Sequence, residues 1–254
     1  MDLSIRKFIV LIFLPAVFSV SWSGTNNFKS NQLNFSRVGK AYQEKWTRIN
    51  NNLTRNSIDP GKLELYLEVF KEEKEIEVWA RNIGDSAFRL IEIFPICHLS
   101  GGPGPKRRQG DLQVPEGFYH IHIFNPRSNF YLSLGLDYPN ASDRILGEKG
   151  NLGGDIFIHG RCVTIGCLPI TDDKIKELYI YCVEARNNGQ MNIPVTIYPV
   201  RLTAYNHQIL KARYHTEIKL LELWSDLEQA YILFRNTGKI PAVTFLNNGR
   251  HKIE

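Results

Sequence analysis

His159 and Cys167 lie eight positions apart in the segment DIFIHGRCVTIGCLPI, and their side chains suit nucleophilic acyl transfer. A thiol attacks a carbonyl group as its thiolate, and a nearby imidazole can stabilise that ion pair. Gly160 follows the histidine and Gly166 precedes the cysteine. A glycine before the nucleophile lets backbone N–H groups turn towards the position where an oxyanion would form. The pattern therefore predicts a cysteine–histidine acyl-transfer site.

Cys162 lies between these two residues and leaves other interpretations open. With His159 and Cys167 it could bind zinc, because thiolates and imidazole are typical zinc ligands. The second ligand pair that usually completes a zinc site is missing. Cys162 and Cys167 could also form a disulfide in an oxidising compartment, or be two buried apolar thiols. Spacing alone does not decide among these.

The two remaining cysteines differ in their setting. Cys182 falls on the apolar stripe of a predicted helix, which favours a place in the core. Cys97 ends the run Leu90–Ile96 and could belong either to the core or to the wall of a site.

The motif HG at 159–160 followed by TIGC at 164–167 resembles the signature of L,D-transpeptidase catalytic domains of the YkuD type, in which HG precedes S/T-x-G-C. The sequence upstream of this motif is similar to the YafK-like branch of that family. The matching segments are GPK at 104–106, GD at 110–111, PEGFY at 115–119, FNP at 124–126, YLSLG at 131–135 and YPN at 138–140. The resemblance extends from about Leu63 to the C-terminus and so covers most of the chain.

This resemblance implies a two-step reaction on the stem peptides of peptidoglycan. Cys167 would attack the carbonyl of an amide between an L-centre and a D-centre, and an amine or water would then resolve the thioester. His159 would share a proton with Cys167, and the Gly160 carbonyl would fix its tautomer. Backbone N–H groups of Gly166 and Cys167 would bind the oxyanion, and the Thr164 hydroxyl would brace the loop. No cofactor and no metal are implied.

The acceptor determines the outcome of such a reaction. An amine acceptor gives a cross-link or attaches a wall-linked protein, whereas water gives hydrolysis. The alternative is a non-catalytic wall-binding or structural module whose histidine and cysteines hold zinc or a disulfide.

The sequence departs from the family where the substrate would be anchored. Many members carry an arginine two residues after the cysteine, and here that position is Pro169. Arg161, Lys106 and Arg107 are the candidates to replace it, although exposed basic residues are common on any surface. His120 follows the PEGFY segment and could line the cleft, but a histidine satisfied within the sheet is the plainer interpretation.

Composition describes a folded, exported protein. The 254 residues are 43% hydrophobic and 22% charged, which is typical of a soluble globular chain. Residues 1–23 resemble a signal peptide, with the basic pair Arg6–Lys7, an apolar run from Phe8 to Val20 and small residues before Gly24. After its cleavage we expect no stable membrane span and a location in the periplasm or envelope of a bacterium; an uncleaved anchor is the alternative. A net charge of +5 does not predict nucleic-acid binding, and nothing specifies an oligomeric state.

Periodicity predicts a mainly β fold with flanking helices (α+β), built as a compact β-sandwich or barrel. We divide the chain into an N-terminal extension (24–60), a catalytic domain (61–200) and a C-terminal helical extension with a hairpin (201–254). The expected strands are Lys62–Phe70, Glu75–Arg81, Phe88–Cys97, Phe118–Phe124, Asn129–Leu134, Ile156–Ile158 and Val195–Tyr198. The expected helices are Ser36–Leu53, packing outside the main domain, Thr171–Arg186, and Leu202–Phe234 with a break near His215. A final hairpin spans Ala242–Ile253.

Overall fold

A computed structural model describes residues 27–254, so the predicted signal peptide lies outside the described residues. The strands are β1 (Leu63–Phe70), β2 (Glu75–Asn82), β3 (Arg89–Pro95), β4 (Gly117–Asn125), β5 (Ser133–Leu136), β6 (Phe157–His159), β7 (Leu168–Pro169), β8 (Ile193–Tyr198), β9 (Val243–Phe245) and β10 (His251–Ile253). The helices are α1 (Phe28–Leu33), α2 (Ser36–Arg55), η1 (Pro60–Lys62), α3 (Ala141–Leu146), α4 (Asp172–Asn187), α5 (Ala204–Arg213) and α6 (Ile218–Thr237). Within this described part, no helix is long and apolar enough to cross a membrane.

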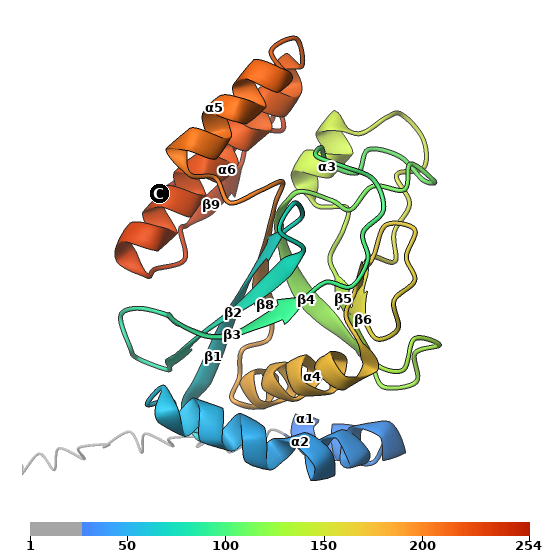
Figure 1. Cartoon of the computed structure of the whole chain (residues 1–254), viewed down its shortest axis with the longest axis vertical. Helices are drawn as coiled ribbons and strands as arrows, with labels where there is room; N and C mark the ends of the chain where they lie inside the picture. Colours follow the sequence, from blue (N-terminus) through green and yellow to red (C-terminus); the bar gives the residue numbers. More distant parts are fainter. Residues whose placement is uncertain (1–26) are drawn as a thin grey trace, which may run out of the picture.

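One eight-stranded sheet, in the order β3-β2-β1-β8-β4-β5-β6-β7, forms the centre of the molecule and curls into a half-barrel (Figure 1). Strand β1 pairs in parallel with β8, and β6 pairs in parallel with β7; the other neighbours are antiparallel. Just beyond β3, the Cys97 N–H donates to the Pro169 carbonyl of β7 at 3.0 Å, so the chain joins the two edges of the sheet. The predicted fold class is confirmed, as a curled single sheet and not as two stacked sheets.

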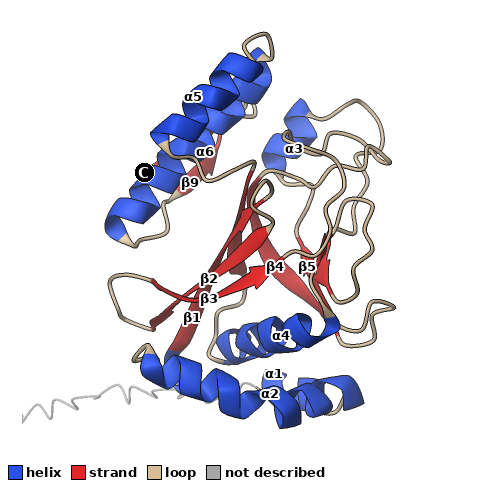
Figure 2. Ribbon diagram, in the orientation of Figure 1, coloured by secondary structure: helices blue, strands red, loops and turns tan. Residues whose placement is uncertain are grey.

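The alternation of β1 decides which helices cover which face of the sheet. Its odd-numbered residues, Leu63, Leu65, Leu67 and Val69, belong to the buried cluster beneath α4. The even-numbered Tyr66 and Phe70 point the other way and pack against side chains of α6. Figure 2 shows the result: α1, α2 and α4 lie on one side of the sheet and α5 and α6 on the other.

Helix α2 packs on the outer side of α4, as expected for a helix outside the main domain, but its apolar face is continuous with the main core. Val38, Ala41, Ile49 and Leu53 are fully buried in the same cluster as the inward side chains of the sheet. The helical period of α2 was visible in the sequence. The surface against which α2 packs, helix α4, could not be read from it. Lys45 and Arg48 add ion pairs to the buried carboxylate of Glu177 on α4.

Local differences from the sequence-based expectations have local causes. The N-terminal extension contains α1 ahead of the expected helix, and no helix was predicted there. The strand expected over Asn129–Leu134 begins only at Ser133, because the preceding residues form turns. Helix α3 was not foreseen; Asn140 starts it with a capping box.

The C-terminal elements agree with expectation. Helices α5 and α6 are separated near His215, as predicted, and β9 pairs with β10 in the predicted hairpin.

The burial of α2 leads to a stability prediction. Ile49→Ala should lower the free energy of unfolding by about 2–5 kcal/mol, because it removes a fully buried side chain and leaves a cavity. Ile218→Ala, the same change at a residue that is 61% exposed, should alter it by less than about 0.5 kcal/mol. Chemical denaturation measures both. Equal effects of the two changes would contradict the placement of α2 in the core.

Candidate active site

The parallel pairing of β6 with β7 places His159 and Cys167 on one face of the sheet. Ile158 is paired with Leu168, and both are fully buried on the core side. Side chains alternate along a strand, so His159, one residue after Ile158, points to the opposite face. Cys167, one residue before Leu168, points to that same face. The structure therefore brings the predicted base and nucleophile to neighbouring strands.

His159 is held in one tautomer. Its side chain is buried, and Nδ1 lies 2.5 Å from the Gly160 carbonyl oxygen. A carbonyl only accepts, so Nδ1 carries the proton and Nε2 is left as the basic nitrogen. The ring of Phe130 covers the imidazole with 4.5 Å between ring centroids. Burial lowers the pKa of His159 below its ordinary value, and the hydrogen bond to Gly160 opposes that change only in part. His159 is therefore neutral at pH 7.

Only glycine fits at position 160. A Cβ atom there would lie 2.5 Å from Asp172 Oδ1 and 2.7 Å from the Phe130 carbonyl oxygen. The same Asp172 Oδ1 accepts the Arg161 N–H at 2.8 Å, which fixes the turn after the histidine. The first residues of α4 thus support the loop that carries the imidazole.

Cys167 is a free, partly buried thiol. Its Sγ lies 3.4 Å from the Asp155 carbonyl oxygen, and no hydrogen bond joins it to His159. Burial raises the pKa of the Cys167 thiol, while a backbone hydrogen bond from Phe157 and the charge of Lys106 oppose the rise. The site at rest therefore holds a neutral thiol beside a neutral imidazole, and not the thiolate–imidazolium pair that the residue types suggest.

Thr164 binds the turn that presents the nucleophile. Its Oγ1 accepts the Cys167 N–H at 2.7 Å and the Gly166 N–H at 3.2 Å, and it donates to the Cys167 carbonyl at 2.9 Å. This is the bracing role expected for Thr164. It also occupies both N–H groups that were expected to bind an oxyanion, so these donors become free only when the Thr164 hydroxyl turns away.

The disulfide in this region joins Cys97 to Cys162, with 5.6 Å between the Cα atoms. A Cys162–Cys167 disulfide is therefore wrong, and Cys162 has no thiolate to offer a metal. Among residues 27–254 no three histidine, cysteine or acidic side chains are grouped so that they could hold a metal ion. Cys182 is fully buried in α4, as its stripe predicted.

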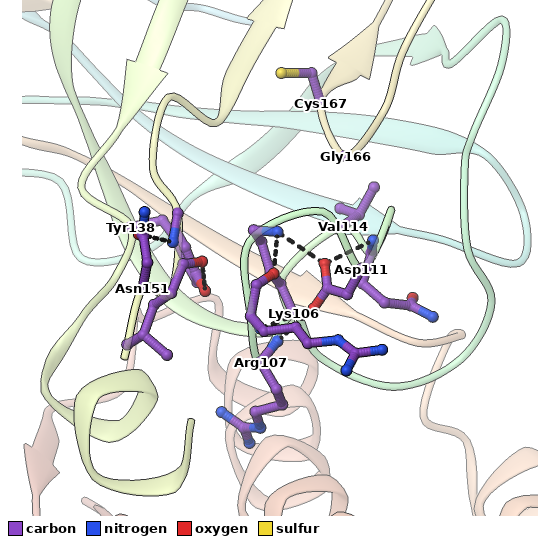
Figure 3. Close-up of polar contacts among 12 residues, drawn as sticks. Lys106, Arg107, Asp111, Val114, Tyr138, Asn151, Gly166 and Cys167 are labelled. Carbon is purple, nitrogen blue, oxygen red and sulfur yellow. Dashed lines mark hydrogen bonds and ion pairs between the residues drawn. The ribbon is translucent and has the colours of Figure 1, made fainter. Parts of the chain in front are cut away.

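The three basic candidates for substrate binding have different surroundings (Figure 3). Lys106 is buried and bound to Asp111 at 2.7 Å, and Arg107 contacts Asp143 at 3.3 Å. Both charges are thus neutralised inside the protein, which argues against either as the anchor. The guanidinium of Arg161 is exposed and makes no ion pair within the described chain. Of the three candidates, Arg161 is therefore the one whose charge is not already paired within the described residues.

His120 lies apart from this site. It pairs with Asp137 at 3.3 Å and lines a cavity with Phe118, Thr196 and Pro241, between the sheet and the C-terminal hairpin. Neither His159 nor Cys167 borders that cavity. The expectation that His120 lines the cleft beside the nucleophile is not supported by this placement.

Sequence reasoning missed three residues that shape the site. Phe130 covers the imidazole, Asp172 binds the turn after it, and the Asp155 carbonyl receives the thiol. Asp172 fell within the helix expected over Thr171–Arg186, which gave no sign that it would bind the turn after His159. Nothing in the sequence pointed to Phe130, because its contact depends on how the loop before β5 folds.

Comparison with known proteins identifies the family. Residues 64–197 match the family model described as YkuD, the L,D-transpeptidase catalytic domain. This chain belongs to that family. It is 36% identical over 191 residues to the YafK protein of Escherichia coli strain K12, whose name places it among the L,D-transpeptidases; the match covers 74% of this chain and 73% of the relative. The YafK protein of Escherichia coli O157:H7 matches equally.

Two solved structures are also similar to this L,D-transpeptidase-family chain. The helical cell shape determining protein Pgp2 from Campylobacter jejuni aligns with a TM-score of 0.44 and 16% identity, over 78% of this chain and 80% of that one. Bd1075 from Bdellovibrio bacteriovorus aligns with a TM-score of 0.39 and 20% identity, over 69% of this chain and 64% of that one.

The neutral resting pair predicts a characteristic pH dependence of thiol reactivity. Cys167 is the accessible thiol, because Cys182 is buried and the other two cysteines form a disulfide. Its alkylation by iodoacetamide should be slow at pH 6–8 and rise steeply towards and above pH 9, because burial raises the thiol pKa above 9.0. The rate of turnover should fall only below pH 6.5, since the pKa of His159 is lowered from that value. Fast alkylation that is constant from pH 5 to 8 would instead indicate a preformed ion pair.

Proposed function

We propose that this protein is an exported cysteine enzyme that cleaves an L-centre–D-centre amide in peptidoglycan stem peptides through a thioester on Cys167. The observation that carries the proposal is the placement of a free thiol and a tautomer-fixed imidazole on one face of β6 and β7. Membership of the L,D-transpeptidase family supports the substrate class.

In the first half-reaction the Cys167 Sγ attacks the amide carbonyl and its proton passes to Nε2 of His159. A C–S bond forms, and the tetrahedral intermediate places a negative charge on the former carbonyl oxygen. His159 then returns the proton to the departing amine as the C–N bond breaks. The acyl group remains on Cys167 as a thioester.

In the second half-reaction an amine or water enters the vacated position. His159, again neutral, takes a proton from this acceptor as it attacks the thioester carbonyl. The C–S bond breaks, and His159 passes the proton it has taken to the leaving Cys167 Sγ, which restores the thiol and the neutral imidazole. An amine acceptor yields a cross-link or a wall-attached protein, and water yields release of the acyl group by hydrolysis.

Oxyanion stabilisation follows from the turn at Thr164. The Gly166 and Cys167 N–H groups point at one acceptor, the Thr164 Oγ1, in the resting state. An oxyanion is a stronger acceptor than a hydroxyl oxygen and can replace it as the intermediate forms. Rotation of one hydroxyl would then transfer both donors to the reacting atom, and the cell envelope would supply the substrate.

Mass spectrometry of muropeptide reactions tests the proposal. Wild-type protein incubated with muropeptides should form an acyl-enzyme on Cys167, and added amine should divert product from hydrolysis to transfer. Cys167→Ala should form no acyl-enzyme, and His159→Ala should reduce turnover by at least about 100-fold, the usual contribution of a positioned base. Cys182→Ala, at the buried free thiol, is the matched control and should keep activity. An acyl group found on another residue, or turnover in Cys167→Ala, would refute the assignment.

Arg161 should determine recognition of a free carboxylate on the substrate. Arg161→Gln should raise KM for a stem peptide with a free carboxylate by about tenfold, the effect of about 1.4 kcal/mol, and leave kcat nearly unchanged. When that carboxylate is amidated, wild-type protein and Arg161→Gln should have similar KM values for the peptide. Arg213→Gln removes an exposed guanidinium from α5 and serves as the control. An equal KM for both peptides in wild-type protein would show that Arg161 does not bind the carboxylate.

A further inference from the structure

We propose that a buried cluster of Lys71, Glu116 and Trp224 positions the β3–β4 loop against Gly166, so that helix α6 helps to set the geometry at Cys167. The β3–β4 loop is residues 96–116, between strands β3 and β4. These three are positioning residues, and none contacts the reacting atoms. The effect on turnover rests on the proposed function; the effect on the thiol does not.

Glu116 is the centre of the cluster. Its carboxylate is almost fully buried, with a residue exposure of 2%. Oε1 accepts from the Lys71 ammonium at 2.8 Å and from the Gly104 N–H at 2.7 Å, and Oε2 accepts from Trp224 Nε1 at 2.7 Å. A buried carboxylate is costly unless it is paired and hydrogen-bonded. Here three donors satisfy the carboxylate: Lys71 after the end of β1, Gly104 in the loop and Trp224 in α6.

Lys71 binds both ends of one stretch of the loop. Its Nζ donates to the Gly104 carbonyl at 2.7 Å and to the Val114 carbonyl at 3.0 Å, in addition to Glu116. An ammonium has three N–H donors, and all three are used. The side chain of Lys71, the residue after β1, thereby holds residues 104 and 114 at a fixed separation.

The stretch held in this way contacts the nucleophile's turn. Gln113 precedes Val114, and its carbonyl oxygen lies 3.1 Å from the position a Cβ would take on Gly166. Gly166 has a φ of +130°, a backbone conformation that favours glycine. Because glycine has no side chain, the backbone at residue 166 can lie close to the β3–β4 loop. Figure 3 shows Val114 between Gly166 and the Lys106–Asp111 pair. A shift of Val114 therefore moves Gln113 against the residue before the nucleophile.

The β3–β4 loop is fixed at both ends. Cys97 near its start is covalently joined to Cys162 in the catalytic loop, and Glu116 at its end is joined to α6. Trp224 itself is fully buried and packs edge-on against Tyr214 at 5.0 Å between ring centroids. A rigid helix thus supports one end of the loop that borders the site. Small displacements of catalytic groups reduce rates strongly, so loss of this support should be felt at Cys167.

The test compares Trp224→Phe with Tyr231→Phe in the full-length protein. Trp224→Phe removes the donor to Glu116 but keeps an aromatic ring. Tyr231 lies on the same helix and packs on Phe70 and Tyr198 instead, so Tyr231→Phe is the matched control. We expect Trp224→Phe to lower kcat at least tenfold with KM within twofold. Its Cys167 should react with iodoacetamide at least twofold faster at pH 7, because a loosened loop admits water to the thiol.

Glu116→Gln provides a second variant and a double-mutant cycle. If Trp224 acts through Glu116, the double variant should lose no more kcat than the more impaired single variant. Wild-type kcat in Trp224→Phe, multiplicative losses in the double variant, or an unchanged pH midpoint of alkylation would each overturn the proposal. If wild-type protein shows no turnover of muropeptides, the proposed function fails, and the alkylation profiles still decide whether the cluster positions Cys167.

Discussion

The parallel register between β6 and β7 is the constraint on which the rest of the site depends. It pairs Ile158 with Leu168, directs both into the core, and thereby turns His159 and Cys167 to the opposite face. A shift of one residue would bury one of the two reacting side chains beneath α4. The two strands are very short, at three and two residues, so their register is set by neighbours: β5 on one side, α4 beneath, and the Cys97 hydrogen bond to Pro169 at the edge.

Electrostatics at this site favour neutrality before reaction. Phe130 and the sheet remove water from the imidazole, and the same burial keeps the proton on the thiol. In the proposed reaction, charge would develop at this site only when a carbonyl is in place to accept the sulfur. The charged groups nearby are largely satisfied among themselves, as the Lys106–Asp111 and Arg107–Asp143 pairs show. Arg161, which is exposed and makes no ion pair among the described residues, is the exception.

Much of this arrangement could be predicted from the sequence where the signal was local. Period-two alternation located β1 and β2, the helix expected over Thr171–Arg186 matches α4, and the break between α5 and α6 was correctly placed. The HG and TIGC motifs pointed to His159 and Cys167 as the candidate base and nucleophile. What could not be predicted depends on contacts between distant segments. The partner of Cys97 lies 65 residues away, and Glu116 and Trp224 are separated by 108. Even Lys106 was misjudged, because an exposed cation and one bound to Asp111 look alike in a sequence.

The cysteine pairing also orders the events by which the protein matures. Cys162 is five residues from Cys167 but is joined to a partner that only the assembled sheet brings near. In an unfolded chain the shorter loop closes more readily, so early oxidation would favour the bond between the two near cysteines. That bond would consume the nucleophile and leave Cys97 free. The native pairing therefore requires that the sheet forms before oxidation or that thiol–disulfide exchange corrects the pairing, so the order of folding and oxidation decides whether Cys167 stays free.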